Sequence, residues 1–190
     1  MTTARYNARW SRSALAASFD LRGDATELRG ALAAAGLPFP DLPNRWISGN
    51  SGARLLRLGP KRIVILADAA EEAALENALV PAFASCPVAD FANISDMLAR
   101  YTITGPGVYD ILKQGTAFEL SETAFPANAA TVTELWTVPV ILLRETITSI
   151  SLLVDCAFSG FIENWLDAAN GFEGGPRPGI MVSPPSPYKP

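Results

Sequence analysis

The chain has 190 residues, of which 49% are hydrophobic and 18% charged, and its formal net charge is −4. This length suits one domain, or two small lobes that share a core. The acidic balance and the lack of a basic cluster exclude the phosphate attraction that nucleic-acid binding requires. No run approaches the roughly 20 apolar residues that cross a bilayer. We therefore expect a soluble, cytoplasmic protein with no nucleic-acid or membrane partner.

Residues 1–13 are polar and rich in arginine, and we expect them to form an irregular arm. The rest of the first half predicts a strand, a helix, a hairpin and a buried strand. The strand spans 18–23, and the helix spans 25–35 with leucine and alanine along one face. The turn sequence Asn50-Ser51-Gly52 predicts the hairpin, and the continuous apolar run 62–68 is typical of a fully buried strand.

A second helix is predicted over 70–79, and the segment that follows it has the composition of a linker. Asp68 stands where its carboxylate can accept hydrogen bonds from the free N–H groups of the first helical turn. Residues 80–93 contain two prolines but also several apolar side chains. This linker is therefore expected to pack on the rest of the protein.

The second half shows a similar order of elements. A short apolar strand around Tyr101 must end at Gly105-Pro106-Gly107 because of the backbone angles that these residues adopt. The helix that follows ends near Gly115, and two strands are predicted over 138–145 and 147–155. The closing helix has the clearest period in the chain. Its apolar face comprises Phe158, Phe161, Ile162, Trp165, Leu166 and Ala169.

An internal repeat indicates two similar halves. At an offset of 87 residues, Leu55-Leu56-Arg57 matches Leu142-Leu143-Arg144, and Asp68 matches Asp155. Chance agreement between two alanine- and leucine-rich stretches is the alternative. Because helices stand between antiparallel-type strands, the predicted class is α+β. The expected architecture is a pair of duplicated strand–helix–strand–strand–helix halves, with room for one more strand in each.

The predicted domain organisation follows from this repeat. A single domain is expected over 14–170, with pseudo-repeats at about 18–80 and 94–170. From 171 to 190 the composition changes to glycine and proline, which cannot bury enough apolar surface to fold alone. Ile180 lies in this tail between apolar neighbours and is a candidate anchor for a partner.

The residues that usually carry catalysis are scarce. The sequence contains no histidine, which removes the usual catalytic triads and most zinc sites. It has no dinucleotide-binding glycine motif and no Walker loop, so no cofactor or metal is expected on this chain. Cys86 and Cys156 fit no disulfide, metal or redox pattern. Cys156 is interpreted as a small buried residue rather than a thiol activated by a helix N-terminus.

Two carboxylates beside apolar strands remain as possible acids or bases. For Asp155, capping of the closing helix is the favoured interpretation. Asp96 lies at the end of the first segment of the second half, and no catalytic role is assigned to it.

Short motifs run in order through the second half: Ile94-Ser95-Asp96, Ile103-Thr104-Gly105-Pro106, Leu112 with Gly115, Phe125-Pro126, Pro139-Val140, Leu142-Leu143-Arg144, Leu152-Leu153-Val154, Phe158 and Trp165-Leu166. In this order they resemble the gamma subunit of heterotetrameric sarcosine oxidase, which is similar in turn to the folate-binding domain of aminomethyltransferase. The likeness covers the second half well and the first half loosely. The chain departs from the family at Asp155-Cys156-Ala157-Phe158, where an Arg-Ser-Phe-Ala-like step is usual, and this leaves the particular complex open.

The resemblance implies a noncatalytic subunit that buttresses the large alpha subunit, in a complex that also contains beta and delta subunits. The complex would oxidise sarcosine to glycine and pass the one-carbon unit to tetrahydrofolate. FAD, FMN, NAD, zinc and tetrahydrofolate would then be held by other subunits. The alternatives are an equivalent subunit of an N-methylglutamate or dimethylglycine oxidoreductase, a stand-alone folate-binding one-carbon protein, or a free-standing binding protein.

A partner would need apolar contact residues, and four are candidates: Trp10, Trp46, Phe39 and Ile180. The first three lie in irregular or proline-flanked stretches, and tryptophan is enriched at interface hot spots. The charged fraction is below the average of about 25%, which agrees with a covered surface but also with an alanine-rich composition. Core packing is the competing interpretation for Trp46 and the favoured one for Trp165.

Overall fold

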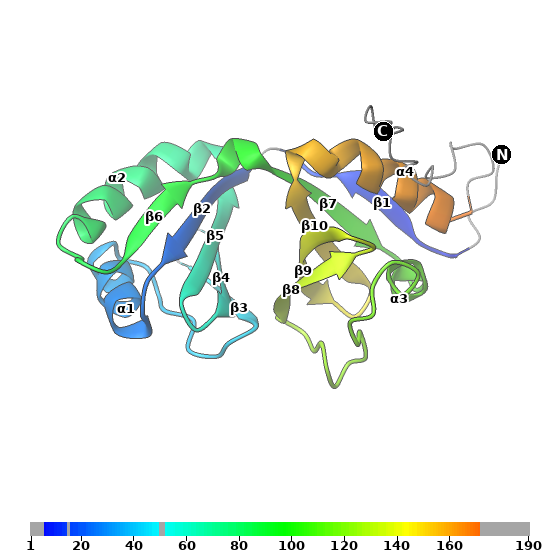
Figure 1. Cartoon of the computed structure of the whole chain (residues 1–190), viewed down its shortest axis with the longest axis horizontal. Helices are drawn as coiled ribbons and strands as arrows, with labels where there is room; N and C mark the ends of the chain where they lie inside the picture. Colours follow the sequence, from blue (N-terminus) through cyan, green and yellow to red (C-terminus); the bar gives the residue numbers. More distant parts are fainter. Residues whose placement is uncertain (1–5, 15, 50–51, 172–190) are drawn as a thin grey trace, which may run out of the picture.

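The computed structural model describes residues 6–14, 16–49 and 52–171, whose strands form two antiparallel sheets with helices packed on them (Figure 1). The first sheet has the strand order β3 (Arg45–Ser48), β4 (Arg54–Gly59), β5 (Arg62–Asp68), β2 (Ala16–Arg22) and β6 (Asp90–Asn93). The second sheet has the order β1 (Arg9–Arg12), β7 (Leu98–Thr104), β10 (Ser149–Asp155), β9 (Val138–Thr146) and β8 (Ala130–Leu135). This combination of helices and antiparallel sheets confirms the α+β class.

Helices lie on the outer face of each sheet, so the chain forms four layers (Figure 1). The first sheet is covered by α1 (Ala25–Ala34) and α2 (Glu72–Phe83), and the second by α3 (Val108–Leu112) and α4 (Ser159–Ala169). Short 3₁₀ turns precede α2, β7 and α4 at Ala69–Glu71, Ser95–Met97 and Cys156–Phe158. Within the described ranges, no helix has the length and apolar character needed to cross a membrane.

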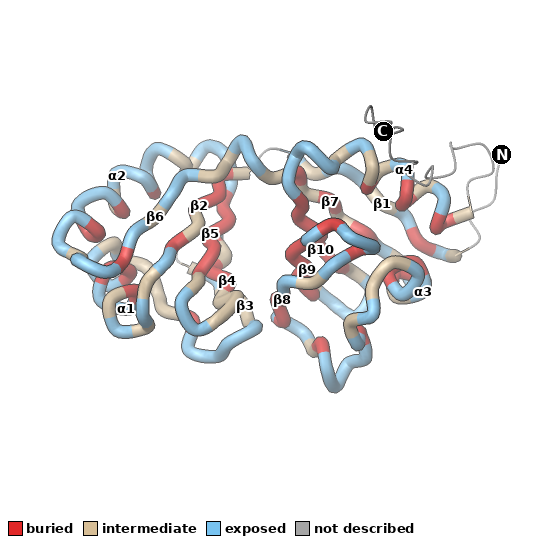
Figure 2. Tube along the Cα trace, viewed as in Figure 1, coloured by how far each residue is buried: buried red, intermediate tan, exposed pale blue. Residues whose placement is uncertain are grey.

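Three apolar clusters fill the spaces between the layers, and Figure 2 shows the buried residues along the inner strands. One cluster packs the first sheet against α1 and α2, and another packs the second sheet against α3 and α4. The third lies between the sheets and includes Leu56 and Val64 from the first and Leu143 from the second. β5 is buried on both faces, because Ile65 packs toward the helices while Val64 packs toward the other sheet. This confirms the interpretation of its continuous apolar run.

Both sheets are built from the same succession of elements. β2–α1–β3–β4–β5–α2 forms most of the first sheet, and β7–α3–β8–β9–β10–α4 forms most of the second with the same strand order. The fifth strand of each sheet is exchanged: β1 precedes the first half yet pairs with β7, and β6 precedes the second half yet pairs with β2. The succession in each half already contains four strands, one more than the predicted strand–helix–strand–strand–helix order, and the exchanged fifth strand was not predicted.

Two segments expected to be irregular are strands. The prediction of an irregular arm over 1–13 is wrong for Arg9–Arg12, which form β1 at the edge of the second sheet. The linker predicted over 80–93 is wrong as irregular structure, because α2 continues to Phe83 and Asp90–Asn93 form β6. Its expected packing on the rest of the protein is confirmed, since Phe83 and Phe91 join the cluster beneath α2. Both strands are short and mostly exposed, so their backbone pairing with a distant strand, rather than a local apolar pattern, determines their conformation.

Aspartates begin two of the helical segments, but not the one expected in the first half. The Asp155 carboxylate accepts a hydrogen bond from the Ala157 amide at 2.9 Å, which confirms its role as a cap. Asp24 caps α1 in the same way. The cap predicted at Asp68 is wrong, because its side chain makes no capping hydrogen bond. Its charge acts instead on Arg100, whose pKa is lowered mainly by burial, and offsets a small part of that lowering.

The closing helix α4 buries most of its predicted face against the second sheet. Trp165 is 3% exposed, and Ile162 and Leu166 are fully buried beside it. The prediction is wrong at Phe158, which is 41% exposed. Phe158 lies in the 3₁₀ turn before α4, where the helical periodicity that relates it to Trp165 does not hold.

Candidate functional site

The two sheets meet at a joint made of backbone hydrogen bonds. The Trp46 amide donates to the Asn128 carbonyl at 2.9 Å, and the Ala130 amide donates to the Asn44 carbonyl at 3.1 Å. These bonds flank an antiparallel bridge between β3 and the residue before β8. Asn44 and Asn128 have φ angles of 56° and 61°, in the left-handed region that asparagine tolerates better than most residues. The joint therefore has the same geometry on both sides.

Two arginines at matching positions hold the loops that lead into this joint. Arg57 on β4 donates through Nη1 to the carbonyl of Asp41, and its guanidinium lies 5.2 Å from the ring centre of Phe39. Arg144 on β9 donates through Nη1 to the carbonyl of Phe125. Each arginine thus binds a loop that contains a Phe-Pro pair. This shared contact gives the repeated Leu-Leu-Arg sequence a structural role.

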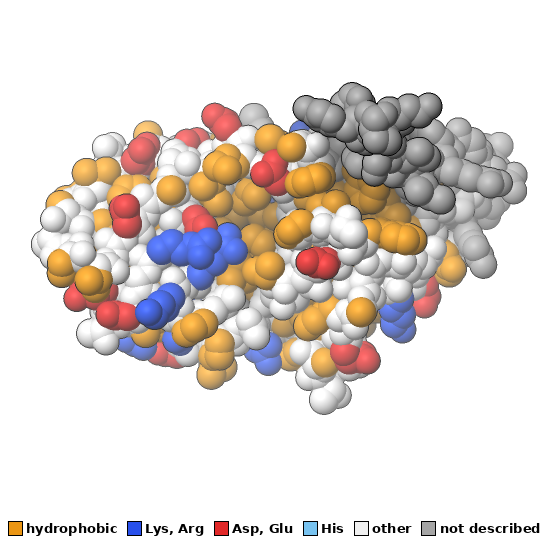
Figure 3. All heavy atoms as spheres, in the orientation of Figure 1, with side chains coloured by type: hydrophobic (Ala, Val, Ile, Leu, Met, Phe, Trp, Pro, Cys, Tyr) orange, Lys and Arg blue, Asp and Glu red, His pale blue; other side chains and the backbone are white. Residues whose placement is uncertain are grey.

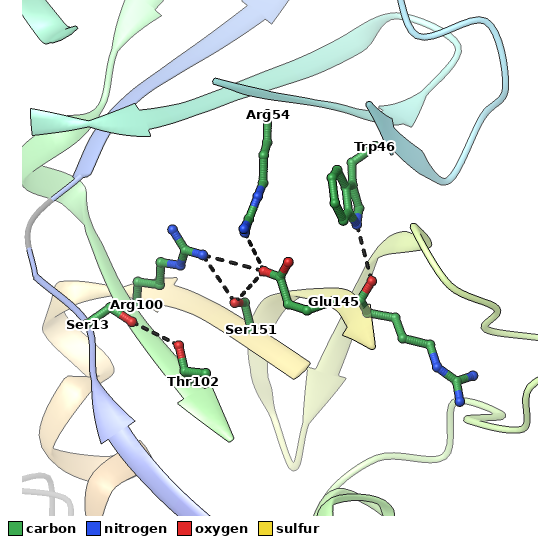
Figure 4. A network of polar contacts seen from close by, with 8 residues as sticks. Ser13, Trp46, Arg54, Arg100, Thr102, Glu145 and Ser151 are labelled. Carbon is green, nitrogen blue, oxygen red and sulfur yellow. Dashed lines mark hydrogen bonds and ion pairs between the residues drawn. The ribbon is translucent and has the colours of Figure 1, made fainter. Parts of the chain in front are cut away.

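A network of charged side chains crosses the space between the sheets (Figure 4). Oε1 of Glu145 on β9 accepts hydrogen bonds from Arg54 on β4, from Arg100 on β7 at 3.4 Å and from Ser151 on β10 at 2.7 Å. Arg54 is the member from the first sheet, so its ion pair with Glu145 ties the two sheets together. The side chains of Arg54 and Glu145 are 29% and 14% exposed, and this shields their pair from water.

In this network two cations share one carboxylate. Burial lowers the pKa of Arg100, and the neighbouring Arg54 lowers it further, whereas Glu145 raises it. Among the described residues, Nε of Arg100 is buried and has no hydrogen-bond partner. Oε1 of Glu145 already accepts three hydrogen bonds from its own chain. This arrangement suits a network that keeps the sheets in register better than one that exchanges protons with a substrate.

The structure places Trp46 in this joint. Its indole Nε1 donates to the Arg144 carbonyl at 3.3 Å, and the Arg54 guanidinium lies 5.1 Å from its ring centre. The ring also packs on the cluster between the sheets. Trp46 is half-buried and makes these contacts within its own chain.

The other proposed partner residues lie elsewhere. Trp10 on β1 is half-buried, and its Nε1 donates to Asp167 at 2.9 Å. Phe39 is half-buried beneath the Arg29 guanidinium, which lies 4.1 Å from its ring centre. Ile180 lies outside the described residues. The structure does not bring Trp10, Trp46 and Phe39 together, and their contact with a partner stays a prediction.

The remaining candidate groups for chemistry are scattered too. Cys86 is half-buried, and burial followed by the nearby Glu27 raises the pKa of its thiol, which disfavours the reactive thiolate. Cys156 is exposed at the start of its 3₁₀ turn, so the expectation of a buried residue is wrong. Asp96 is exposed in another such turn. In the part of the chain that the structure describes, no cluster of three or more Cys, Asp or Glu side chains could hold a metal.

The surface feature that the sequence did not reveal is Trp136. It is 58% exposed at the two-residue turn between β8 and β9, with φ of 59°. Beside it lies an open hollow of about 460 Å³ between β8 and the loop that follows α3. The two-residue gap between the apolar runs of β8 and β9 was the available signal for this turn, but not for its exposure.

Large apolar side chains are exposed in several other places: Leu42, Val80, Val88, Met97, Val132, Ile147 and Phe158. Figure 3 shows one face of the molecule, on which apolar side chains gather between the two halves and basic side chains gather over the first half.

Comparison with known proteins places this architecture. Neither a family model nor a curated protein sequence matches the chain. A solved chain of the heterotetrameric sarcosine oxidase from Corynebacterium sp. U-96, in complex with pyrrole 2-carboxylate, is 25% identical with a TM-score of 0.79. The match covers 88% of this chain and 86% of that one.

A second solved structure shows the fold alone. The glycine cleavage system aminomethyltransferase T from Bartonella henselae has a TM-score of 0.66 at 12% identity, over 86% of this chain and 46% of that one. These matches confirm the resemblance predicted from the sequence and extend it to both halves. The chain is similar, over most of its length, to a chain of a heterotetrameric sarcosine oxidase and has the fold of part of an aminomethyltransferase.

Proposed function

We propose that the chain is the noncatalytic gamma-type subunit of a heterotetrameric, flavin-dependent sarcosine oxidase in the cytoplasm. The observation that carries this proposal is the nearly complete mutual coverage with a chain of such an oxidase, 88% of one and 86% of the other. A match of this kind relates a subunit to a subunit. By contrast, the chain spans under half of the aminomethyltransferase.

In this proposal the chain buttresses the alpha subunit, beside beta and delta subunits. The complex oxidises sarcosine to glycine and passes the one-carbon unit to tetrahydrofolate. FAD, FMN, NAD, zinc and tetrahydrofolate are held by the other subunits.

The side chains of this subunit support a structural role. The sequence has no histidine, and the half-buried Glu145 carboxylate is already paired with Arg54 and Arg100. Burial raises the pKa of Tyr101 to about 12, so its phenol keeps its proton at neutral pH. These groups hold the fold together and leave few candidates for proton transfer.

We also propose that the two halves arose by duplication. The support is the recurrence of the same contacts at corresponding positions: the left-handed Asn44 and Asn128, and the arginines Arg57 and Arg144 bound to Phe-Pro loops. The shared strand order of the two sheets agrees with this origin.

Two other functions fit the same fold. An equivalent subunit of an N-methylglutamate or dimethylglycine oxidoreductase would differ in the substrate of its complex. A stand-alone folate-binding one-carbon protein is less well supported, because the aminomethyltransferase is only 12% identical, against 25% for the oxidase chain.

Purification of the tagged chain from its native cell tests the assembly. We expect a flavin-containing complex with larger subunits, whose oxygen consumption depends on sarcosine. Dimethylglycine and N-methylglutamate, assayed in parallel, distinguish the related complexes. A stable monomer that carries no flavoprotein would contradict the proposal.

A second test concerns the site of catalysis. Replacement of Cys86, Cys156 or Asp96 by alanine in the assembled complex should leave turnover within about threefold of the wild type, whereas loss of an acid or base typically costs 10²–10⁴. Steady-state kinetics on the intact complex provide the measurement. A hundredfold loss with the complex intact would place catalysis on this chain.

A further inference from the structure

Trp136 has a conformation and an exposure that its own fold does not require. A φ of 59° is uncommon for a bulky residue, and hairpin turns of two residues usually place glycine or asparagine at such positions. The corresponding hairpin of the first half has a glycine, Gly52, at φ 78°. Strained residues of this kind concentrate at functional sites, which makes the turn a candidate contact surface.

The turn forms one wall of a groove. Gly115, Thr116 and Phe118 line one side, and Val132, Glu134 and Trp136 line the other. The walls are fixed to each other, because the Trp136 amide donates to the Gly115 carbonyl at 2.6 Å and the hydroxyls of Thr116 and Thr133 lie 3.2 Å apart. An aromatic ring, apolar side chains and one carboxylate thus line a preformed, open groove.

The last described helix delivers the following chain to the rim of this groove. Gln114, the neighbour of Gly115, donates through Nε2 to the Ala169 carbonyl at 3.1 Å. The sequence then continues from Gly171 through a segment with six prolines and the cations Arg177 and Lys189. An extended proline-rich chain rises about 3.1 Å per residue, so the 13 residues after Gly171, up to Pro184 (184 − 171), could span about 40 Å.

We propose that the groove binds the proline-rich C-terminal segment of the same chain. Residues 184–187 (Pro-Pro-Ser-Pro) supply the rings that stack on Trp136, in the way that proline-rich segments occupy aromatic grooves. Lys189, two residues further on, complements the exposed carboxylate of Glu134. This inference concerns the chain alone and does not depend on which oxidase contains it.

Because the segment is attached to the chain close to the groove, weak binding is sufficient to keep the groove occupied. A segment attached next to its binding site has an effective concentration on the order of millimolar, so the groove is mostly occupied even at modest intrinsic affinity. Occupation would cover a tryptophan that the described part of the chain leaves 58% exposed.

Hydroxyl-radical labelling of the full chain, as purified from its native cell, tests the proposal. Trp136 is the only tryptophan between Lys113 and Arg144, so one tryptic peptide reports on it alone. Truncation after Gly171 and the triple variant P184S/P185S/P187S should each raise its labelling about threefold, as expected for release of a mostly occupied site. Ile147→Ser, an equally exposed apolar residue in the β9–β10 turn, is the matched control and should leave the labelling unchanged.

Labelling of Trp46, which lies in the joint between the sheets, reports whether a variant is folded. If truncation unfolds the chain, the proline variant, which keeps the full length, decides the outcome. Unchanged labelling of Trp136 in the folded proline variant would overturn the proposal. This holds equally if a partner subunit or another part of the tail covers the groove instead.

Discussion

Glu145→Gln should lower the free energy of unfolding by about 3–5 kcal/mol, because it removes the carboxylate that two largely shielded guanidinium groups share. Glutamine keeps the shape of the side chain and one acceptor oxygen, so the change removes charge rather than volume. Arg54 and Arg100 then face each other without the carboxylate that separates them. For a chain of this length, this loss corresponds to a fall of about 6–20 °C in Tm, measured by calorimetry.

Asp41→Asn is the matched control. Asp41 forms an ion pair with Arg29 in which the two side chains are 70% and 55% exposed. Such surface pairs contribute about 0–1 kcal/mol, so this variant should shift Tm by only a few degrees. Equally small shifts in both variants would mean that the network around Glu145 does not hold the sheets together.

Trp165→Ala should destabilise the protein by about 3–5 kcal/mol, the range for removing a large aromatic side chain from a core. Trp165 is 3% exposed between α4 and the second sheet. It also packs so closely on Gly115 that a Cβ at this glycine would lie 2.8 Å from the indole ring. The loss is a large part of a typical domain stability of about 5–15 kcal/mol, and urea unfolding of the isolated chain measures it.

Phe158→Ala is the comparison within the same predicted face. Because Phe158 is 41% exposed, its truncation should cost less than about 1 kcal/mol. Melting of both variants in the assembled complex separates a core residue from a contact residue. If Trp165→Ala leaves the isolated chain unchanged but prevents assembly, then Trp165 faces a partner and the described packing of α4 is wrong.

The elements with a strong local pattern could be predicted from the sequence. The apolar run of β5 and the three- and four-residue spacing of α4 each report burial directly, because a buried face imposes its own period on the chain. The repeated Leu-Leu-Arg sequence indicated an internal repeat, but not the loop contacts that its two arginines make.

The exchanged strands could not be predicted in this way. Arg9–Arg12 and Asp90–Asn93 have four residues each and are mostly exposed, so neither carries an alternating apolar pattern. Their strand conformation depends on hydrogen bonds to β7 and β2, both of which lie far away in the sequence. Local propensity is a weak guide where pairing determines the structure.

The joint between the sheets was hidden for a related reason. Arg54, Arg100, Glu145 and Ser151 come from four strands, and no spacing in the sequence relates them. Trp46 was assigned to a partner or to the core with equal weight, and its contacts across the joint depend on the meeting of β3 and β8, which no local pattern announces. The conformation of Trp136 was hidden because tryptophan is an unusual residue for a left-handed turn position.

The exchange of β1 and β6 also determines when each sheet can be completed as the chain is synthesised. The first sheet needs nothing beyond Asn93, since β6 is its last strand. β1 is translated before the strands of the first sheet, but it cannot pair until β7 has been made. Its residue Arg9 pairs with Thr104, which is 95 residues later in the chain (104 − 9). The chain loses conformational entropy when so long a loop closes, before the contacts that stabilise the closed loop have formed. Such pairing is therefore slow. The earliest strand to leave the ribosome is therefore the one that has to stay unpaired the longest.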